Sequence, residues 1–328
     1  MRYKLALNLV LIALGCVGIA RFCHHETRGF SRSKIEGNLA MAPEIAIASD
    51  PAVEQLLNQK FYYFSRGKQS FAFLSEDGKY VLKLFNNTYQ RKLQWLKIAQ
   101  SIPFLSSWAK ERTTYFQSKI DRTFYSYQIA FEKMPEQTAL CYAHLGASSY
   151  LPGRVTIVDP LHIAHELDPN KIGFLLQKRV DLAYPYLKTR IERGEIAEAR
   201  QGIASLVELF FWKYRHAIAD NDPLIRTNYG FLEGKAVQID VGPLSIDNSF
   251  KDNDLQKKES ARVLASLKSW LEKNGPELIA FLDEELGRQL SWSNEENAHP
   301  LLSPCPLSGD PAADRAEDPR LLPAEDLR

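Results

Sequence analysis

The sequence predicts an α+β fold in which a small antiparallel sheet comes first along the chain and a compact, mostly helical part follows. Short aromatic-rich runs at 61–65, 71–75 and 80–85 have the character of strands, and the turn Glu76-Asp77-Gly78 joins the last two as a hairpin. Between Glu195 and His216 the apolar residues recur at helical spacing, which predicts a long helix with one buried face.

The remaining elements alternate between the two types. Helical patterns occupy 88–99 and 110–133, and strand-like runs follow at 155–159, 161–167 and 172–180. A polar loop after His216 leads to a short hairpin and the apolar strand 236–239. The pattern of residues 254–290 predicts one or two amphipathic helices, with a break at Asn274-Gly275-Pro276.

Composition and charge exclude several classes of protein. The 328 residues are 45% hydrophobic and 25% charged, as in ordinary globular proteins. The net charge of +1 gives no overall field to attract nucleic acid, so no nucleic-acid partner is expected. The four cysteines lack the spacing of a disulfide framework or a metal site; they are Cys16, Cys23, Cys141 and Cys305. A reduced intracellular domain is therefore expected.

Both ends of the chain differ from its middle. Residues 5–20 are apolar and follow Arg2 and Lys4, so 1–21 is expected to be a signal peptide or a signal anchor, with cleavage and anchoring both open. Basic residues after this run favour a membrane-associated protein with a cytosolic body, and export is the alternative. Residues 22–54 are expected to form a tether, and 291–328, with six prolines, a disordered tail.

Two segments near the predicted sheet carry chemistry. Ser65-Arg66-Gly67-Lys68-Gln69-Ser70 is a polar loop between the first two strands, and its small residues allow backbone amides to approach a ligand. Lys83 lies inside the apolar run 80–85, where an ammonium group is costly to bury without an anionic partner. A solvent-facing lysine is the alternative, because side chains alternate along a strand.

The most informative segment is 220–242. Asn228 precedes Asp240 by twelve residues with a small hairpin between them, and Asp240-Val241-Gly242 ends an apolar strand. Asp220 and Asp222 lie in the polar loop just before, where aspartates also serve ordinary turns.

Together these motifs resemble the protein-kinase-like superfamily, including its small-molecule phosphotransferase branches, over about residues 60–245. The resemblance implies two lobes, with a small antiparallel-sheet N-lobe and hinge in 55–180 and a compact helical C-lobe in 181–290. The loop is similar to the family's G-x-G-x-x-G-x-V sequence with serines in place of both outer glycines. The run that contains Lys83 is similar to its V-A-I-K strand.

The resemblance also implies roles for individual residues. Asp222 matches the catalytic base, with Asp220 as the alternative, although six positions separate Asp222 from Asn228 where the family has five. Glu132 is the preferred helix-borne partner of Lys83, ahead of Glu111 and Glu136. The remaining implied roles are Ser65, Gly67, Ser70 and Lys83 at the nucleotide phosphates, Gln177 and Val180 in the hinge beside adenine, and Asn228 and Asp240 on magnesium.

The resemblance implies an ATP- and Mg²⁺-dependent phosphotransferase whose acceptor and oligomeric state the sequence does not name. The serine-substituted loop and the altered Asp-to-Asn spacing are consistent with an alternative, a catalytically silent kinase-like binding module tethered to a membrane. A third possibility is an anchored structural protein without a nucleotide site. Convergence of Lys83, Asn228 and Asp240 on one cleft separates this third possibility from the first two.

Overall fold

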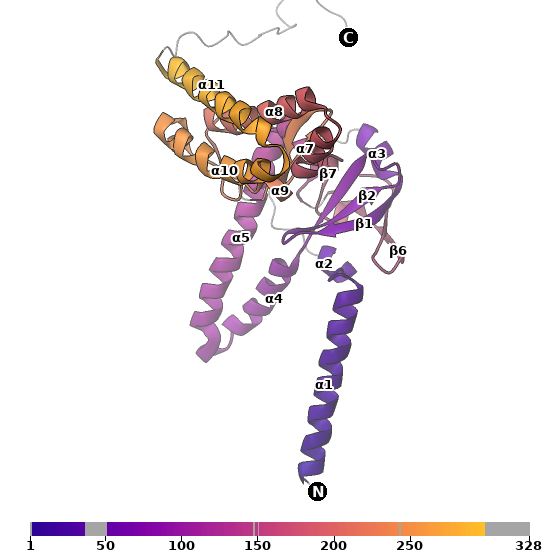
Figure 1. Ribbon diagram of the computed structural model, residues 1–328. Coiled ribbons are helices and arrows are strands. Elements are labelled where there is room, and N and C mark those ends of the chain that lie inside the picture. Colours follow the sequence, from indigo (N-terminus) through magenta and orange to yellow (C-terminus); the bar gives the residue numbers. More distant parts are fainter. Residues whose placement is uncertain (1, 37–50, 147, 150, 243, 299–328) are drawn as a thin grey trace, which may run out of the picture.

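A computed structural model describes residues 2–36, 51–146, 148–149, 151–242 and 244–298. It is an α+β structure in which a mixed sheet lies beside a helical region, which confirms the predicted class (Figure 1). The polypeptide passes from the sheet to the helical region through residues 179–180.

The main sheet has seven strands within the described residues, in the order β4-β7-β3-β2-β1-β5-β6. Their bounds are β1 Lys60–Arg66, β2 Ser70–Ser75, β3 Tyr80–Phe85, β4 Leu140–His144, β5 Val155–Val158, β6 Ala164–Leu167 and β7 Phe174–Lys178. Neighbouring strands are antiparallel except β1 and β5, which run parallel. The expectation of a small, purely antiparallel sheet is therefore wrong, because the β5–β6 hairpin extends the sheet beyond β1.

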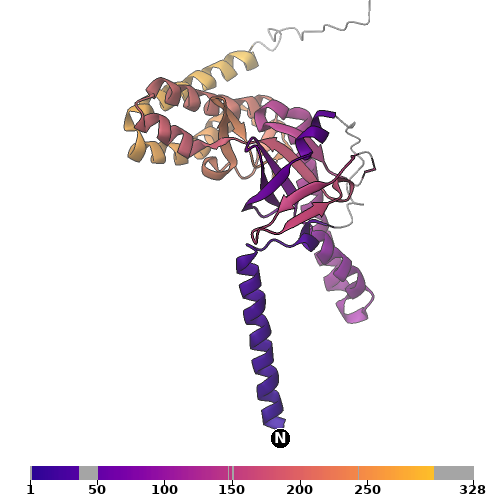
Figure 2. The same cartoon turned by 90° about the vertical axis from the view of Figure 1, so that its right-hand side faces the viewer.

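Two helices follow β3, and one of them packs on the sheet. They are α4 (Thr88–Gln100) and α5 (Ser106–Lys133), connected by the 3₁₀ turn Pro103–Leu105, and α6 (Pro135–Thr138) follows. The C-terminal half of α5 packs on the sheet through Tyr127, Ile129 and Ala130. The rest of α5 and most of α4 pack on each other and project from the body as a helical hairpin (Figures 1 and 2).

The helical region is organised around α8 (Ile196–Arg215), which has ten buried residues, eight of them in the apolar core. It packs against α7 (Ala183–Glu192), α10 (Asn253–Asn274) and α11 (Ile279–Ala298). Two small sheets complete this region, β8 (Asp181–Leu182) with β10 (Tyr229–Leu232) and β11 (Lys235–Gln238), and β9 (Ile218–Asp220) with β12 (Leu244–Ile246). The short helix α9 (Ile225–Asn228) and 3₁₀ turns at Pro169–Lys171, Asn248–Lys251 and Pro276–Leu278 connect these elements.

The N-terminal part begins with the helix α1 (Arg2–Glu26), which projects from the body (Figure 1), and continues with α2 (Arg32–Ile35) and α3 (Pro51–Leu57). Phe30 and Ile35 are 4% and 1% exposed and belong to the core under the sheet. This stretch of the expected tether is thus packed on the body, while 37–50 lies outside the described residues. None of the described helices is long and apolar enough to span a bilayer.

At the other end, α11 continues through Ala298, so the first residues of the expected tail are helical. The rest of that tail, 299–328, lies outside the described residues.

Candidate functional site

The candidate site lies where β3 of the main sheet meets the segment that follows β11. Lys83 projects from β3, and its Nζ donates a hydrogen bond of 2.5 Å to the carbonyl oxygen of Ile239, the residue before Asp240. The two residues are 156 positions apart in the chain. This contact joins the sheet to the helical region at the place where the sequence expects a nucleotide.

Burial lowers the pKa of Lys83 to about 8, and the nearby carboxylate of Asp240 opposes that shift. No carboxylate within the described residues forms an ion pair with this ammonium group at 4 Å or less. One hydrogen bond to a carbonyl oxygen uses one of the three N–H groups of the ammonium, so Lys83 retains donor capacity for an anion.

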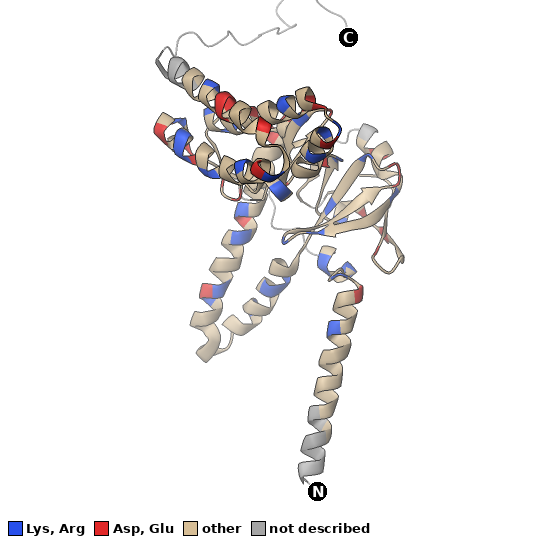
Figure 3. Ribbon diagram, in the orientation of Figure 1, with Lys and Arg blue, Asp and Glu red and all other residues tan. Residues whose placement is uncertain are grey.

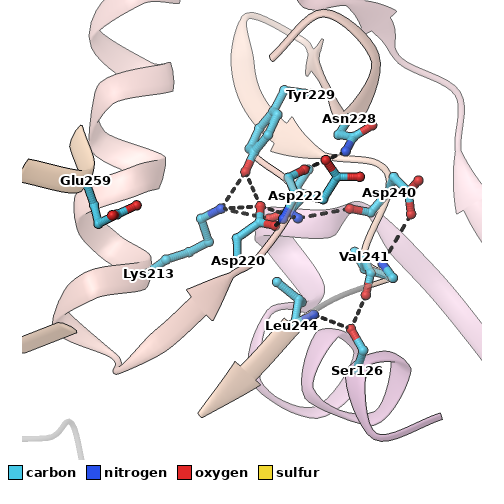
Figure 4. A network of polar contacts seen from close by, with 12 residues as sticks. Ser126, Lys213, Asp220, Asp222, Asn228, Tyr229, Asp240, Val241, Leu244 and Glu259 are labelled. Atoms are coloured by element: carbon cyan, nitrogen blue, oxygen red, sulfur yellow. Dashed lines mark hydrogen bonds and ion pairs between the residues drawn. The ribbon is translucent and has the colours of Figure 1, made fainter. Parts of the chain in front are cut away.

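Asn228 is linked to the same residue, Ile239. The amide N–H of Ile239 donates to the carbonyl oxygen of Asn228 at 2.7 Å, and the side-chain Nδ2 of Asn228 donates to the carbonyl oxygen of Asp222 at 2.7 Å. Asp240 is exposed and uses Oδ1 to accept a hydrogen bond of 3.1 Å from the amide of Gly242 (Figure 4). The structure therefore brings Lys83, Asn228 and Asp240 together.

The two aspartates of the preceding loop have different surroundings. Asp220 is buried, and its Oδ2 contacts Lys213 Nζ at 3.1 Å, the Tyr229 hydroxyl at 2.5 Å and Gln238 Nε2 at 2.9 Å (Figure 4). Its Oδ1 accepts from the backbone N–H of Asp222 at 3.0 Å. Asp222 itself is exposed. Asp220 therefore holds the loop, and of the two candidate bases only Asp222 offers its carboxylate to solvent.

The buried network around Asp220 is a part of the site that the sequence reasoning missed. The side chain of Lys213 on α8 is 1% exposed, and its Nζ also contacts Tyr229 and Gln238. Gln238 extends the network by donating to the carbonyl oxygen of Asp240 at 2.9 Å. Lys213 follows the buried Phe210 by three residues, so helical spacing places it on the buried face and could have signalled a structural lysine.

Charge compensation stabilises this network. Burial alone would raise the pKa of Asp220, but the Lys213 ammonium and the Tyr229 hydroxyl outweigh burial and hold that pKa below its ordinary value. Burial lowers the pKa of Lys213, and Asp220 counteracts it. Burial next to Asp220 raises the pKa of Tyr229 well above its ordinary value. Tyr229 therefore stays a neutral hydrogen-bond donor.

The expected phosphate loop is the short turn between the end of β1 at Arg66 and the start of β2 at Ser70. Ser65 and Gly67 are exposed, Ser70 is half-buried, and the amide of Gly67 donates to the carbonyl oxygen of Ser70 at 2.9 Å. Gln69 bends toward the site, because a Cβ built on Gly242 would lie 2.8 Å from its Oε1. The Tyr127 hydroxyl of α5 donates to the same oxygen at 3.1 Å. The loop thus lies over the Asp240-Val241-Gly242 segment.

The expected pairing of Glu132 with Lys83 is not formed. Glu132 is exposed and accepts a hydrogen bond from Gln128 on its own helix. Glu132 lies two positions, about 200° of helical rotation, beyond the buried Ala130, so it faces away from the sheet. The alternatives Glu111 and Glu136 are exposed as well.

In place of a glutamate, α5 contributes a hydroxyl to the site. Ser126 donates to the carbonyl oxygen of Val241 and accepts from the amide of Leu244 at 2.7 Å (Figure 4). Both contacts hold the backbone that follows Asp240.

The expected hinge residues are used for packing. Gln177 is buried in β7, and its Nε2 donates to the carbonyl oxygen of Thr138 at 2.5 Å. Val180 lies against the backbone of Gly230, where an added Cβ would come within 2.6 Å of Val180 Cγ2 and 2.5 Å of the Asp181 carbonyl oxygen. This close approach requires glycine at 230.

The metal-binding capacity of the site is limited to a few oxygen atoms. The described residues contain no group of three or more His, Cys, Asp or Glu side chains able to hold a metal ion. The carboxylate of Asp240 and the side-chain oxygen of Asn228, which accepts a hydrogen bond of 2.8 Å from the Thr227 hydroxyl, are hard oxygen atoms of the kind that Mg²⁺ prefers.

Comparisons with known proteins found no matching family model and no matching curated protein. Among solved structures, the chain is similar to the medium-resolution structure of the bifunctional kinase-methyltransferase WbdD, with 12% sequence identity and a TM-score of 0.31. The match covers 70% of this chain and 47% of WbdD, so this chain spans about half the length of that protein.

Proposed function

We propose that the chain is an ATP- and Mg²⁺-dependent phosphotransferase of the kinase type with an unidentified acceptor. The observation that carries this proposal is the hydrogen bond from Lys83 to the carbonyl oxygen of Ile239, the residue before Asp240. The amide of Ile239 in turn donates to the backbone carbonyl oxygen of Asn228. A buried ammonium, an amide and two exposed carboxylates at one place are the donor set that phosphoryl transfer requires.

In this proposal each residue has one task. The ammonium of Lys83 contacts the α and β phosphates, and the side-chain oxygens of Asn228 and Asp240 hold magnesium. The carboxylate of Asp222 accepts the proton of the acceptor hydroxyl and orients its oxygen. When bound, ATP would supply the transferable phosphoryl group, and its Mg²⁺ would neutralise charge that develops during transfer.

The Asp220 network supports this arrangement as a positioning device. Asp220 holds the backbone of Asp222 through its amide, and Gln238 holds the backbone of Asp240 through its carbonyl oxygen. The two acidic residues therefore share one buried anchor, which limits their relative movement.

A catalytically silent kinase-like binding module is the second candidate. The unformed Glu132–Lys83 pair favours it, as does Gln69, whose side chain reaches Gly242 where the loop would cover phosphates. In this alternative the candidate site binds a nucleotide or partner without transfer.

Two measurements on the full chain separate these candidates. A thermal-shift titration with Mg·ATP reports binding, because a ligand that binds only the folded state stabilises it. ATP turnover reports transfer, and Asp240→Ala is expected to lower it by about a hundredfold or more. The matched control is Asp254→Ala, an exposed aspartate at the start of α10, which should leave turnover unchanged.

A thermal shift without turnover would establish the binding module. If the chain shows no thermal shift and no turnover, both candidates are refuted, and a protein without a nucleotide site is favoured.

A further inference from the structure

The end of the helical hairpin formed by α4 and α5 exposes large apolar side chains. We call residues 95–108 the hairpin tip. Phe104 is 84% exposed, Trp95 72%, Ile98 61% and Trp108 53%. Soluble proteins rarely gather several large aromatic and aliphatic side chains on a convex surface without a partner.

These side chains do not serve the hairpin's own core. The two helices pack on each other through Leu93, Leu96, Ala109, Phe116 and Ile120. Trp95 and Ile98 lie on the opposite side of α4 from Leu93 and Leu96, and Phe104 lies in the turn between the helices. Folding therefore gives no reason for large apolar residues at the tip.

The hairpin is also strongly basic, although the whole chain carries a net charge of only +1. Residues 88–119 contain a single acid, Glu111. The basic residues of the same stretch are Arg91, Lys92, Lys97, Lys110, Arg112 and Lys119. Figure 3 shows basic residues outnumbering acidic ones on this projection. An apolar end with basic flanks complements a layer whose interior is apolar and whose outer boundary is anionic.

A second apolar projection lies on the same side of the molecule. Helix α1 exposes Leu11, Ile12, Leu14, Val17, Ile19 and Phe22, each at 51% or more. Figures 1 and 2 both show α1 and the hairpin extending from the same side of the body. One flat surface could therefore meet both projections at once.

We propose that the hairpin tip inserts into the interface of a lipid bilayer that contains anionic lipids, beside α1. Tryptophan and phenylalanine side chains partition into the boundary between head groups and acyl chains, and lysine and arginine side chains contact anionic head groups. A nucleic acid would match the basic residues but would leave the aliphatic side chains of α1 uncovered. This proposal is independent of catalysis.

The test is vesicle flotation of the full chain with matched double variants. Trp95→Gln/Ile98→Ser alters the tip, and Trp292→Gln/Ile163→Ser removes the same two side-chain types from exposed positions elsewhere, where they are 48% and 52% exposed. On phosphatidylcholine vesicles containing phosphatidylglycerol, the tip variant should partition roughly tenfold more weakly than the wild type. The control variant should partition as the wild type does.

Lipid composition and salt provide the electrostatic arm of the test. Wild-type binding should weaken when phosphatidylglycerol is omitted or salt is raised, because the basic flanks lose their anionic partner. Circular dichroism of both variants checks that the fold is intact.

Tryptophan fluorescence gives a second measurement that does not depend on the double variants. Lipids brominated along the acyl chain should quench part of the tryptophan fluorescence of the wild type, and the quenched fraction should fall in Trp95→Gln. Equal partitioning of both double variants, or no quenching, would overturn the proposal. So would RNA binding or self-association that the tip variant abolishes while vesicle binding persists.

Discussion

Lys83 occupies a position where its charge is poorly solvated, and this makes its protonation state sensitive to pH. Its pKa of about 8 reflects burial, which the carboxylate of Asp240 only partly offsets. A bound phosphate would add negative charge and raise that pKa. Binding of an anion at this site is therefore linked to proton uptake when the pH is above about 8.

This linkage predicts the pH dependence of nucleotide affinity. Below pH 8 Lys83 is already protonated and the affinity for Mg·ATP should be nearly constant. Above pH 8 the affinity should fall by up to about tenfold per pH unit, because the free protein must first take up a proton. Isothermal titration calorimetry in buffers of different ionisation enthalpy measures that uptake. Lys83→Met should abolish the linkage, and an unchanged proton uptake in this variant would assign it to another group.

Lys213 is a second buried lysine, and it is paired with Asp220. Its removal should lower the stability of the fold. Lys213→Met would leave Asp220 buried without its cation, so the free energy of unfolding should fall by about 3–5 kcal/mol. Adding Asp220→Asn in the same chain should recover part of this loss. The matched control is Lys268→Met, which removes an exposed lysine paired with Asp283 and should change stability by less than about 1 kcal/mol. Urea denaturation measures all three variants, and similar losses for Lys213→Met and Lys268→Met would contradict the structural role of the network.

Among the elements, the strand pair β8–β10 depends on a single glycine. Gly230→Ala would place a methyl group 2.5 Å from the Asp181 carbonyl oxygen, so the backbone of β8 must shift. We expect a loss of about 1–3 kcal/mol in the free energy of unfolding. Gly287→Ala in the interior of α11 is the matched control, because it meets open space and should stabilise the helix by up to about 1 kcal/mol. Equal effects of the two variants in thermal denaturation would show that the approach at 230 is not tight.

The sequence predicted elements well where local signals are complete. Strands β1 to β3 follow from aromatic runs and an Asp-Gly turn, and α8 follows from its apolar spacing. The parallel pairing of β1 with β5 and the short strand β4 depend on contacts between distant segments, which local patterns do not specify.

At the candidate site, too, local sequence signals identified some residues, while the roles of others depend on contacts between distant segments. Spacing and strand context located Lys83, Asn228 and Asp240, which the structure brings together. The face on which Glu132 lies depends on how α5 packs against the sheet, and the roles of Ser126 and Gln238 depend on tertiary contacts. Motif spacing carries no information about such contacts.

At the scale of the whole molecule, the N-terminal segment is part of the sheet core. Phe30 contacts Phe71 and Phe73 edge to face, with ring centroids 5.4 Å and 5.6 Å apart. We expect Phe30→Ala to lower the free energy of unfolding by about 3–5 kcal/mol, since it leaves a cavity under the sheet. Phe22→Ala, at a position that is 66% exposed on α1, should change it by less than about 0.5 kcal/mol. Similar denaturation midpoints for both variants would place Phe30 outside the folding unit.

The burial of Phe30 and Ile35 also limits how the chain could be matured. A peptidase that cuts within α1 would release a leader whose side chains from Leu11 to Phe22 face outward, and the body would keep its core. A cut beyond Ile35 would remove two core residues and the backbone acceptor of Asn87. A mature form that keeps these core contacts therefore begins ahead of Phe30.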